Sequence, residues 1–346
     1  MPPKAPVPDP APFSPVARED DGGLDLALRP RSFEGFVGQH QVVDNLRVAI
    51  AAARQREEPL DHTLLSGLPG LGKTTLACLL SREAGTELRL TSGPALSKAA
   101  DLAGILTNLR KGDFLFVDEV HRLGPVVEEY LYAAMEEFAI DIVIDSGPAA
   151  RSVRVTLQPF TLVGATTREG LLSAPFRSRF GITEKLEPYP AGDLREVLRR
   201  SAAMLEVRID EAATAILAER GRGTPRVANR FLKRARDVAQ LTTGGRITEA
   251  VARETMDRLG VDENGLSAVD RALLAGLARN GGGPMGLKTL ALLVAEEQDT
   301  VEEVVEPFLL RQGFLDRTPR GRRLTERGFA ALGEKPPAGP AATLFR

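Results

Sequence analysis

The sequence predicts an α/β domain built on a parallel sheet, then a small helical domain, then a C-terminal unit that ends in a short basic hairpin. Four short stretches typical of strands occur in the first half, at 62–66, 88–91, 113–117 and 161–165, and 113–117 reads as a buried strand. They alternate with helical patterns such as 44–55 and 74–84, as expected for parallel strands covered by helices. Residues 193–260 then read as helical throughout.

The composition excludes several classes of protein. The chain has 346 residues, 43% of them apolar, which is enough for two or three globular domains. Its 45 basic and 47 acidic residues nearly cancel, so any nucleic-acid binding must come from a local patch. One cysteine, Cys78, cannot form an internal disulfide, and with three histidines it gives no zinc-type cluster. No apolar run is long enough to span a membrane, so we expect a cytoplasmic protein.

Composition and periodicity divide the chain into five segments. Residues 2–15 hold seven prolines, and such a stretch cannot bury a core. The predicted segments are a disordered proline-rich tail (1–23), a large α/β domain (24–185), a helical domain (186–260), a C-terminal domain (261–335) and a frayed tail (336–346).

Residues 139–157 change to a period of two and predict a β-hairpin inserted into the α/β domain. Apolar residues alternate with polar ones on both sides of a Ser-Gly-Pro turn. An isolated hairpin needs something to cover its apolar face. Either the domain's own core or a binding partner can cover that face, and the sequence leaves both possibilities open.

A glycine-rich segment between the first strand and its helix carries the strongest motif. Residues 67–75 read GLPGLGKTT and match the phosphate-binding pattern G-x-x-x-x-G-K-[ST]. Glycines let backbone N–H groups surround phosphate oxygens, and the following helix N-terminus faces the same anion. Lys73 suits the β- and γ-phosphates of ATP, and the Thr74 hydroxyl suits Mg²⁺. We therefore predict a Mg·ATP site.

Two later strands end in polar residues, at the edge where open α/β sheets bind ligands. Strand 113–117 delivers Asp118, a candidate Mg²⁺ ligand, and Glu119, a candidate to polarise the attacking water. Strand 161–165 ends near Thr167, whose hydroxyl can align water beside the γ-phosphate. For Thr167 taken alone, a simple strand-end turn is the stronger alternative.

Two arginines outside this edge are candidates for phosphate contacts. Arg179 can contact the nucleotide of a neighbouring subunit, and Arg177 is a competing candidate for that role. The alternative is that Arg179 only forms an ion pair at the surface. An arginine supplied in trans raises phosphoryl-transfer rates by about 10³–10⁵. Arg226 follows Gly-Thr-Pro at the start of a predicted helix, where it can contact phosphates and sense hydrolysis.

These elements, in this order, resemble an AAA+ ATPase, and the resemblance narrows to the RuvB family of Holliday-junction branch-migration motors. The stretches that match closely are Leu28-Arg29-Pro30, Val37-Gly38-Gln39, the phosphate loop, Thr91 to Pro94, Asp118 to Leu123, Gly147 to Arg151, Gly164 to Arg168, Arg179 to Ile182, Gly223 to Arg226 and Arg317 to Arg322. The resemblance spans 24–333. It implies an AAA+ P-loop domain with an inserted hairpin, an all-α lid domain and a C-terminal winged helix.

The family implies a role for each matching residue. Leu28 and Arg29 touch the adenine side, and Tyr189 lies at the domain hinge. The residues that hold phosphates and Mg²⁺ are Gly70, Gly72, Lys73, Thr74 and Thr75. The catalytic residues are Lys73, Asp118 and Glu119 (the last two as metal and water carboxylates), Thr167 as first sensor and Arg179 as trans arginine, and Arg226 binds the nucleotide as second sensor. The hairpin resembles the docking site for RuvA, with Val153 and Val155 as apolar contacts, and Arg317 and Arg322 resemble wing residues that touch DNA.

The C-terminal hairpin region gives independent support for DNA contact. Between 306 and 327 six arginines stand against three acidic residues. A wing with a few arginines suits contacts to the phosphate backbone, which carry no sequence information. The chain departs from the family pattern at two places: at Leu68, where a proline is usual, and in the sequence of residues 174–178 before Arg179.

The resemblance implies an ATP-driven homo-hexameric ring around double-stranded DNA. Together with RuvA it would promote branch migration of four-way junctions in recombination and repair, with the RuvC resolvase as a further partner. A clamp loader or another AAA+ DNA remodeller is the nearest alternative, although the C-terminal unit favours a winged helix over a helical collar. A non-catalytic ATP-gated DNA tether is disfavoured because Lys73, Asp118 and Glu119 are all present.

Overall fold

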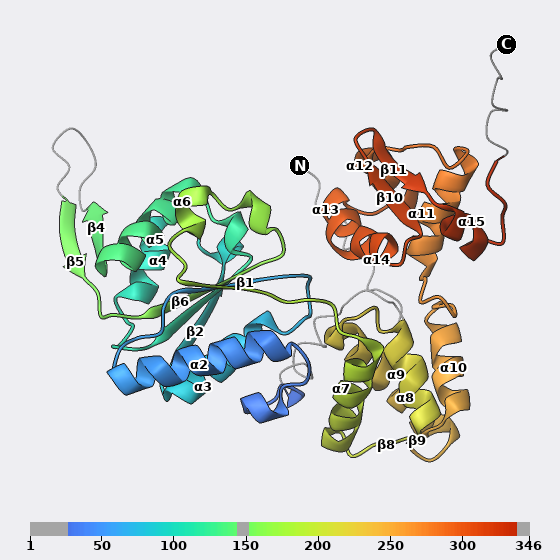
Figure 1. Ribbon diagram of the computed structural model, residues 1–346, viewed down its shortest axis with the longest axis horizontal. Coiled ribbons are helices and arrows are strands. Elements are labelled where there is room, and N and C mark those ends of the chain that lie inside the picture. Colours follow the sequence, from blue (N-terminus) through green and yellow to red (C-terminus); the bar gives the residue numbers. More distant parts are fainter. Residues whose placement is uncertain (1–26, 144–151, 338–346) are drawn as a thin grey trace, which may run out of the picture. The chain divides into compact units, whose positions relative to one another are not determined.

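The computed structural model describes residues 27–143 and 152–337. The chain divides into two compact units, one of Arg29–Tyr189 and one that contains Leu28 and the chain from Pro190 onward (Figure 1). The predicted tail at 1–23 and the hairpin stretch 147–151 lie outside the described residues, as does most of the tail at 336–346.

The first unit is built on a five-stranded parallel sheet in the order β2-β3-β6-β1-β7. Its strands are β1 (Thr63–Ser66), β2 (Leu88–Ser92), β3 (Phe114–Asp118), β6 (Thr161–Thr166) and β7 (Ile182–Lys185). Its helices are α2 (His40–Arg56), α3 (Lys73–Ala84), α4 (Ala99–Leu106), α5 (Pro125–Glu137) and α6 (Ala174–Arg177). Its 3-10 turns are Phe33–Gly35, Gly93–Ala95, Val120–Arg122 and Glu169–Leu171. In Figure 1, α2 and α3 cover one face of the sheet, and α4 and α5 cover the other.

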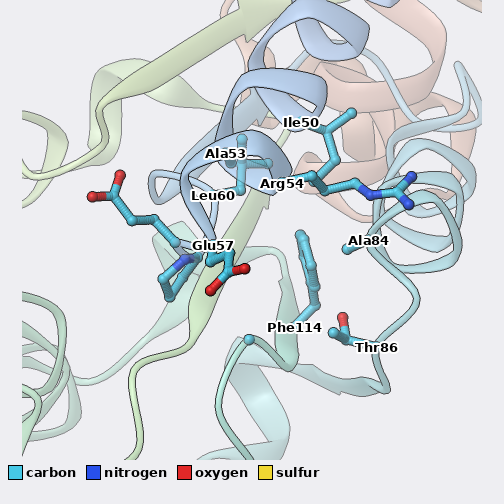
Figure 2. Close-up of a pocket in the computed structure, with 11 residues that line it drawn as sticks. Ile50, Ala53, Arg54, Glu57, Leu60, Ala84, Thr86 and Phe114 are labelled. Carbon is cyan, nitrogen blue, oxygen red and sulfur yellow. The ribbon is translucent and has the colours of Figure 1, made fainter.

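The buried strand β3 shows how the sequence produces this layering. Successive side chains of a strand point to opposite faces. Leu115 and Val117 therefore join the apolar cluster formed with α4 and α5. Phe114 points the other way, into a pocket that it shares with Ile50 and Ala53 of α2 (Figure 2). That pocket lies at the amino end of β3, so it is not the nucleotide site predicted at the carboxyl end.

Four of the five strands lie where the apolar stretches predict them. Strand β7 was missed because it is a sheet edge with alternating burial, and its sequence Ile-Thr-Glu-Lys gives no apolar run. The inserted hairpin is confirmed as the antiparallel pair β4 (Ala139–Val143) and β5 (Ser152–Thr156).

His62, directly before β1, ties the sheet to α5. Its Nδ1 accepts a hydrogen bond from the Leu162 N–H at 2.9 Å, and its Nε2 lies 3.1 Å from the Met135 carbonyl. An amide donor at Nδ1 and a carbonyl acceptor at Nε2 require the neutral tautomer protonated at Nε2. Burial lowers the pKa of His62, which agrees with a ring that stays neutral.

The second unit begins with a helical domain of α7 (Ala191–Met204), α8 (Glu211–Arg220), α9 (Pro225–Thr242) and α10 (Glu249–Arg258). The prediction of a wholly helical region needs one correction. The two-residue strands β8 (Arg208–Ile209) and β9 (Arg246–Ile247) pair in parallel and join the ends of the helices. Two-residue strands leave no periodicity that a sequence pattern can reveal.

The C-terminal part is a winged helix with its own apolar core. It contains α11 (Ala268–Arg279), α12 (Leu287–Val294), α13 (Gln298–Thr300), α14 (Glu306–Arg311) and α15 (Glu326–Ala331). A π-helical turn, Val301–Val305, joins α13 to α14. The wing is the antiparallel hairpin of β10 (Leu315–Thr318) and β11 (Gly321–Leu324). Within the described residues, no helix combines the length and apolarity needed to cross a membrane.

Candidate active site

The loop between β1 and α3 has the backbone that a phosphate cradle needs. Gly67, Gly70 and Gly72 have φ of 139°, 79° and 107°, in a region that side chains other than hydrogen disfavour. A Cβ on Gly67 would also lie 2.6 Å from the Leu186 carbonyl oxygen. The loop ends at the first turn of α3, whose N–H groups have no partner within the helix and are suited to bind an anion.

Lys73 is the first residue of α3 and is 7% exposed. Its ammonium donates to the carbonyls of Gly67 at 2.7 Å and Leu68 at 3.0 Å, so it lies inside the loop. Thr74 and Thr75 follow in the first turn and are half-buried. The loop, its lysine and both hydroxyls are therefore gathered at one point, as the motif predicts.

Tyr189 and Arg29 also reach this part of the first unit. The Tyr189 hydroxyl donates to the Leu71 carbonyl at 3.3 Å, and the side chain is buried. The Arg29 guanidinium lies 3.8 Å from the sulfur of Cys78 on α3. Both residues thus contact the loop or its helix, and their contacts with the nucleotide stay predictions.

Asp118 and Glu119 lie at the carboxyl end of β3, in a turn with an unusual backbone. Glu119 has φ 48° and ψ 49°, a left-handed conformation that costs a residue with a side chain roughly 1–2 kcal/mol. Its N–H donates to Asp118 Oδ1 at 3.0 Å, and its carbonyl accepts from the Arg122 N–H at 2.9 Å. Strain of this kind gathers at functional sites because the surroundings must hold it in place.

Gly93, in the turn after β2, packs directly on the Glu119 turn. A Cβ built on Gly93 would lie 2.5 Å from the Glu119 carbonyl oxygen and 3.2 Å from the backbone of Arg122 and Leu123. Because backbone atoms cannot move aside as a flexible side chain can, only glycine fits here. This contact explains the Thr91–Pro94 stretch, for which the sequence alone gave no role.

Thr167 and His121 meet at the Glu119 carboxylate. The Thr167 hydroxyl donates to Glu119 Oε2 at 3.1 Å. His121 Nδ1 lies 3.2 Å from the same oxygen and 2.9 Å from the Thr166 hydroxyl. The parallel pairing of β3 with β6 produces this meeting, because both strands end at the same edge. His121 is a residue that the sequence analysis missed: it lies in the Asp118–Leu123 stretch, but only the fold shows its neighbours.

Arg179 lies after α6 and is held within its own unit. It donates to the Pro175 carbonyl at 2.8 Å and to Glu136 at 2.9 Å, and its guanidinium lies 4.7 Å from the centre of the Tyr132 ring. The competing candidate, Arg177, is exposed. Neighbouring Phe180 is buried against Gly164 of β6, which anchors the segment to the sheet.

Leu28 and Arg226 belong to the second unit. Leu28 is 3% exposed, and its carbonyl accepts a hydrogen bond from Arg200 of α7. Arg226 is the second residue of α9, directly after a turn in which Arg222 and Gly223 both have positive φ. Their roles at the nucleotide stay predictions.

The Arg222 turn is fixed to the winged helix. Arg222 pairs with Asp270, which is fully buried, and its guanidinium lies 4.5 Å from the centre of the Phe308 ring. It also donates to the Gly265 carbonyl at 2.9 Å. The turn that carries Arg226 is therefore tied by three contacts to the domain that follows.

The two hairpin valines differ in their surroundings. Val155 is half-buried and packs against the core of the first unit, whereas Val153 is 46% exposed. The domain's own core thus covers part of the hairpin, and Val153 remains available to a partner.

The wing places its two predicted DNA contacts differently. Arg317 is exposed, with its side chain 59% accessible and 3.2 Å from Glu302. Arg322, its cross-strand partner, is only 8% exposed, and its guanidinium contacts Glu306 at 2.7 and 3.0 Å. Arg320, in the turn of the wing, is exposed. The surface arginines of the wing are therefore Arg317, Arg320 and Arg323, the last of which pairs with Asp316. Arg322 is buried in an ion pair, and its contact with DNA stays a prediction.

Replacing Gly93 with alanine should reduce turnover more than nucleotide affinity. The added methyl would displace the Glu119 turn while leaving the phosphate loop intact, so we expect kcat for ATP to fall at least about tenfold and affinity to change less than about threefold. Steady-state hydrolysis and nucleotide titration measure the two effects. Gly104→Ala on α4 is a matched control, because its Cβ would meet nothing within 4 Å. Equal kcat for both variants would contradict the role of Gly93.

Three family models match the chain in succession. Residues 28–186 match the Holliday junction DNA helicase RuvB P-loop domain, 189–262 the RuvB AAA lid domain, and 263–333 the RuvB C-terminal winged helix domain.

Relatives and solved structures agree with this succession. The RuvB subunit of the Holliday junction branch migration complex from Myxococcus xanthus is 53% identical over 94% of this chain and 95% of its own. The subunit from Chlorobaculum tepidum is 54% identical over 86% of this chain and 87% of its own. A structure titled as the Thermotoga maritima RuvB Holliday junction branch migration motor is 47% identical, with a TM-score of 0.82 over 90% of this chain and all of the other. With the same three domains in the same order and more than half of the aligned residues identical to those of curated relatives, this chain belongs to the RuvB family.

Proposed function

We propose that the protein is an ATP-driven motor that moves DNA through four-way junctions. The observation that carries this proposal is the meeting of the Lys73 loop, the Asp118–Glu119 turn and Thr167 at one sheet edge, in a chain that also carries a winged helix. The curated relatives, named as subunits of the Holliday junction branch migration complex, support the junction as substrate.

Hydrolysis needs a held phosphate chain and an aligned water. Lys73 and the N-terminus of α3 bind the β- and γ-phosphates of ATP, which fixes the position of the γ-phosphorus. Glu119 orients the attacking water, and Thr167 lies beside it. Such positioning is the main contribution of a protein to phosphoryl transfer, because the loose transition state needs little covalent chemistry.

The residues present fit a Mg²⁺ ion carried with the nucleotide. Thr74 and Asp118 offer oxygen ligands, which Mg²⁺ prefers. No group of three or more acidic, histidine or cysteine side chains within the described residues forms a metal cage. Mg²⁺ would therefore take most of its remaining ligands from phosphates and water, and it would neutralise charge on the β- and γ-phosphates.

Arg179 supplies the argument for assembly. Its guanidinium is held on the Tyr132 ring by its own unit, and we propose that it completes the site of a neighbouring subunit in a homo-hexameric ring. Val153 would contact RuvA through the hairpin, and the RuvC resolvase is a further proposed partner. Arg226 would contact the nucleotide and transmit its hydrolysis to the helical domain. We further propose that the protein acts on chromosomal DNA in the cytoplasm, during recombination and repair.

The test uses a synthetic four-way junction with homologous arms, a RuvA protein and Mg·ATP. The wild type should convert the junction to duplex products only when ATP is present. Lys73→Ala should lose conversion together with nucleotide binding. Glu119→Gln should keep nucleotide binding and lose turnover by a factor of about 10² or more, because it keeps the shape of the side chain but not its charge.

Two results would count against the proposal in different ways. Junction conversion without hydrolysis, or by Glu119→Gln at the wild-type rate, would point to an ATP-gated tether rather than a motor. Hydrolysis that never leads to conversion would leave an AAA+ ATPase acting on a different DNA structure.

The wing arginines should separate into two kinds. Arg317→Ala and Arg320→Ala should weaken binding to duplex DNA of any sequence and lower the slope of log affinity against log salt by about 1 each, since each removes one phosphate contact. Arg322→Met should instead lower the stability of the winged helix by roughly 3–5 kcal/mol, because it removes both hydrogen bonds to buried Glu306 and leaves that carboxylate only the Arg317 guanidinium at 3.9 Å. Fluorescence anisotropy over a salt series and thermal melting measure both effects. A stable Arg322→Met variant with a reduced salt slope would make Arg322 a DNA contact.

A further inference from the structure

The Glu119 carboxylate receives its two described side-chain contacts on one oxygen. The Thr167 hydroxyl donates to Oε2 from the end of β6, and His121 Nδ1 lies 3.2 Å from Oε2 from the turn after β3. The His121 side chain is 5% exposed, so its ring is fixed by packing, whereas Glu119 is 28% exposed and open to the site.

The protons around His121 can be assigned from its neighbours. The Thr166 hydroxyl oxygen accepts the Arg168 N–H at 3.0 Å and lies 2.9 Å from His121 Nδ1. Glu119 Oε2 already accepts the Thr167 hydroxyl, so it presents lone pairs to the ring as well. An unprotonated Nδ1 would point its lone pair at that oxygen, and the two lone pairs would repel each other. The ring therefore carries a proton on Nδ1 and donates it toward Glu119 Oε2 and the Thr166 hydroxyl.

We propose that His121 is a positioning residue for ATP hydrolysis: it holds Oε2 of Glu119 and so directs Oε1 toward the attacking water. This inference rests on the proposed hydrolase function and deepens it. His121 never touches the nucleotide in this account. It acts through Glu119, whose catalytic oxygen is the one that neither His121 nor Thr167 contacts.

The backbone explains why His121 can fulfil this role. The left-handed conformation of Glu119 starts the 3-10 turn Val120–Arg122, which brings the residue two positions later back over the carboxylate. The ring also contacts Thr166 at the end of β6, so His121 links the two strand ends that carry Glu119 and Thr167. The Thr167 hydroxyl can therefore turn toward a phosphate while Glu119 keeps its contact with His121.

Two substitutions of His121 distinguish a role in positioning Glu119 from a role in filling space. In asparagine the side-chain amide nitrogen stands two bonds from Cβ, as Nδ1 does, whereas in glutamine it stands three bonds away, as Nε2 does. His121→Asn should therefore retain kcat within about threefold. His121→Gln should lower kcat about 10- to 100-fold, the range expected for losing a hydrogen bond to a charged group, with KM for ATP changed less than about twofold.

The controls separate failure of this proposal from failure of the proposed function. Hydrolysis by the wild type and none by Glu119→Gln would establish the reaction independently of His121. His40→Gln, an exposed site at the start of α2, is a matched control for the chemical change. Equal kcat for His121→Asn and His121→Gln, or equal losses accompanied by a lowered melting temperature, would overturn the positioning role.

A spectroscopic measurement tests the proton assignment without any turnover. The chain has only three histidines, so ¹⁵N-histidine labelling and single substitutions assign every ring. His121 should show a protonated Nδ1, and its signal should shift in Glu119→Gln. His62 is an internal reference, because its neighbours require the opposite tautomer, protonated at Nε2. A wild-type His121 with an unprotonated Nδ1 would overturn the proposal whatever the rate measurements show.

Discussion

The contact of Gly93 with the carbonyl of Glu119 is the constraint on which the candidate active site depends. It lets the turn after β3 approach the turn after β2 closely enough for Glu119 to keep its left-handed backbone. That backbone positions the Glu119 carboxylate, brings His121 back over it and places it beside Thr167. The parallel sheet contributes the rest, because β1, β3 and β6 are neighbours that all end at one edge. The Lys73 loop and the Glu119 turn are thus separate local structures joined by strand order, and the proposed binding and water-aligning roles are divided between them.

The sequence predicted those parts that depend on nearby residues. The phosphate loop, four strands of the parallel sheet and the inserted hairpin are each encoded within a few positions, and the structure contains all of them, although β2 is intermediate to exposed. Strand β7 was missed because an edge strand with polar alternation has no strong signal. The burial of Arg322 was missed for a different reason: Glu306 approaches it from α14, and only the packed wing shows that pairing. His121 was visible in a motif, but its neighbours belong to a strand 45 residues later.

In the second unit, the turn before α9 is joined to the winged helix. Arg222 contacts Asp270 and Phe308 of the winged helix, and Arg226 follows four residues later at the start of α9. Truncating Arg222 would leave a buried carboxylate without its partner, which is costly. The helix before the wing is acidic, with Glu302 and Glu303 beside buried Glu306, so the wing rather than this helix offers positive charge to DNA. A movement of the helical domain would therefore be passed to the wing through a fixed contact.

The most direct measurement is a structure of the assembled protein with Mg²⁺, ADP and beryllium fluoride bound as an ATP mimic. We predict that Glu119 keeps its left-handed backbone against Gly93 and that His121 Nδ1 stays within hydrogen-bond distance of Oε2. We also predict that the water in line with the phosphorus mimic lies on Oε1. A Glu119 turn that unwinds when the nucleotide binds, or a water held by Oε2, would contradict these predictions.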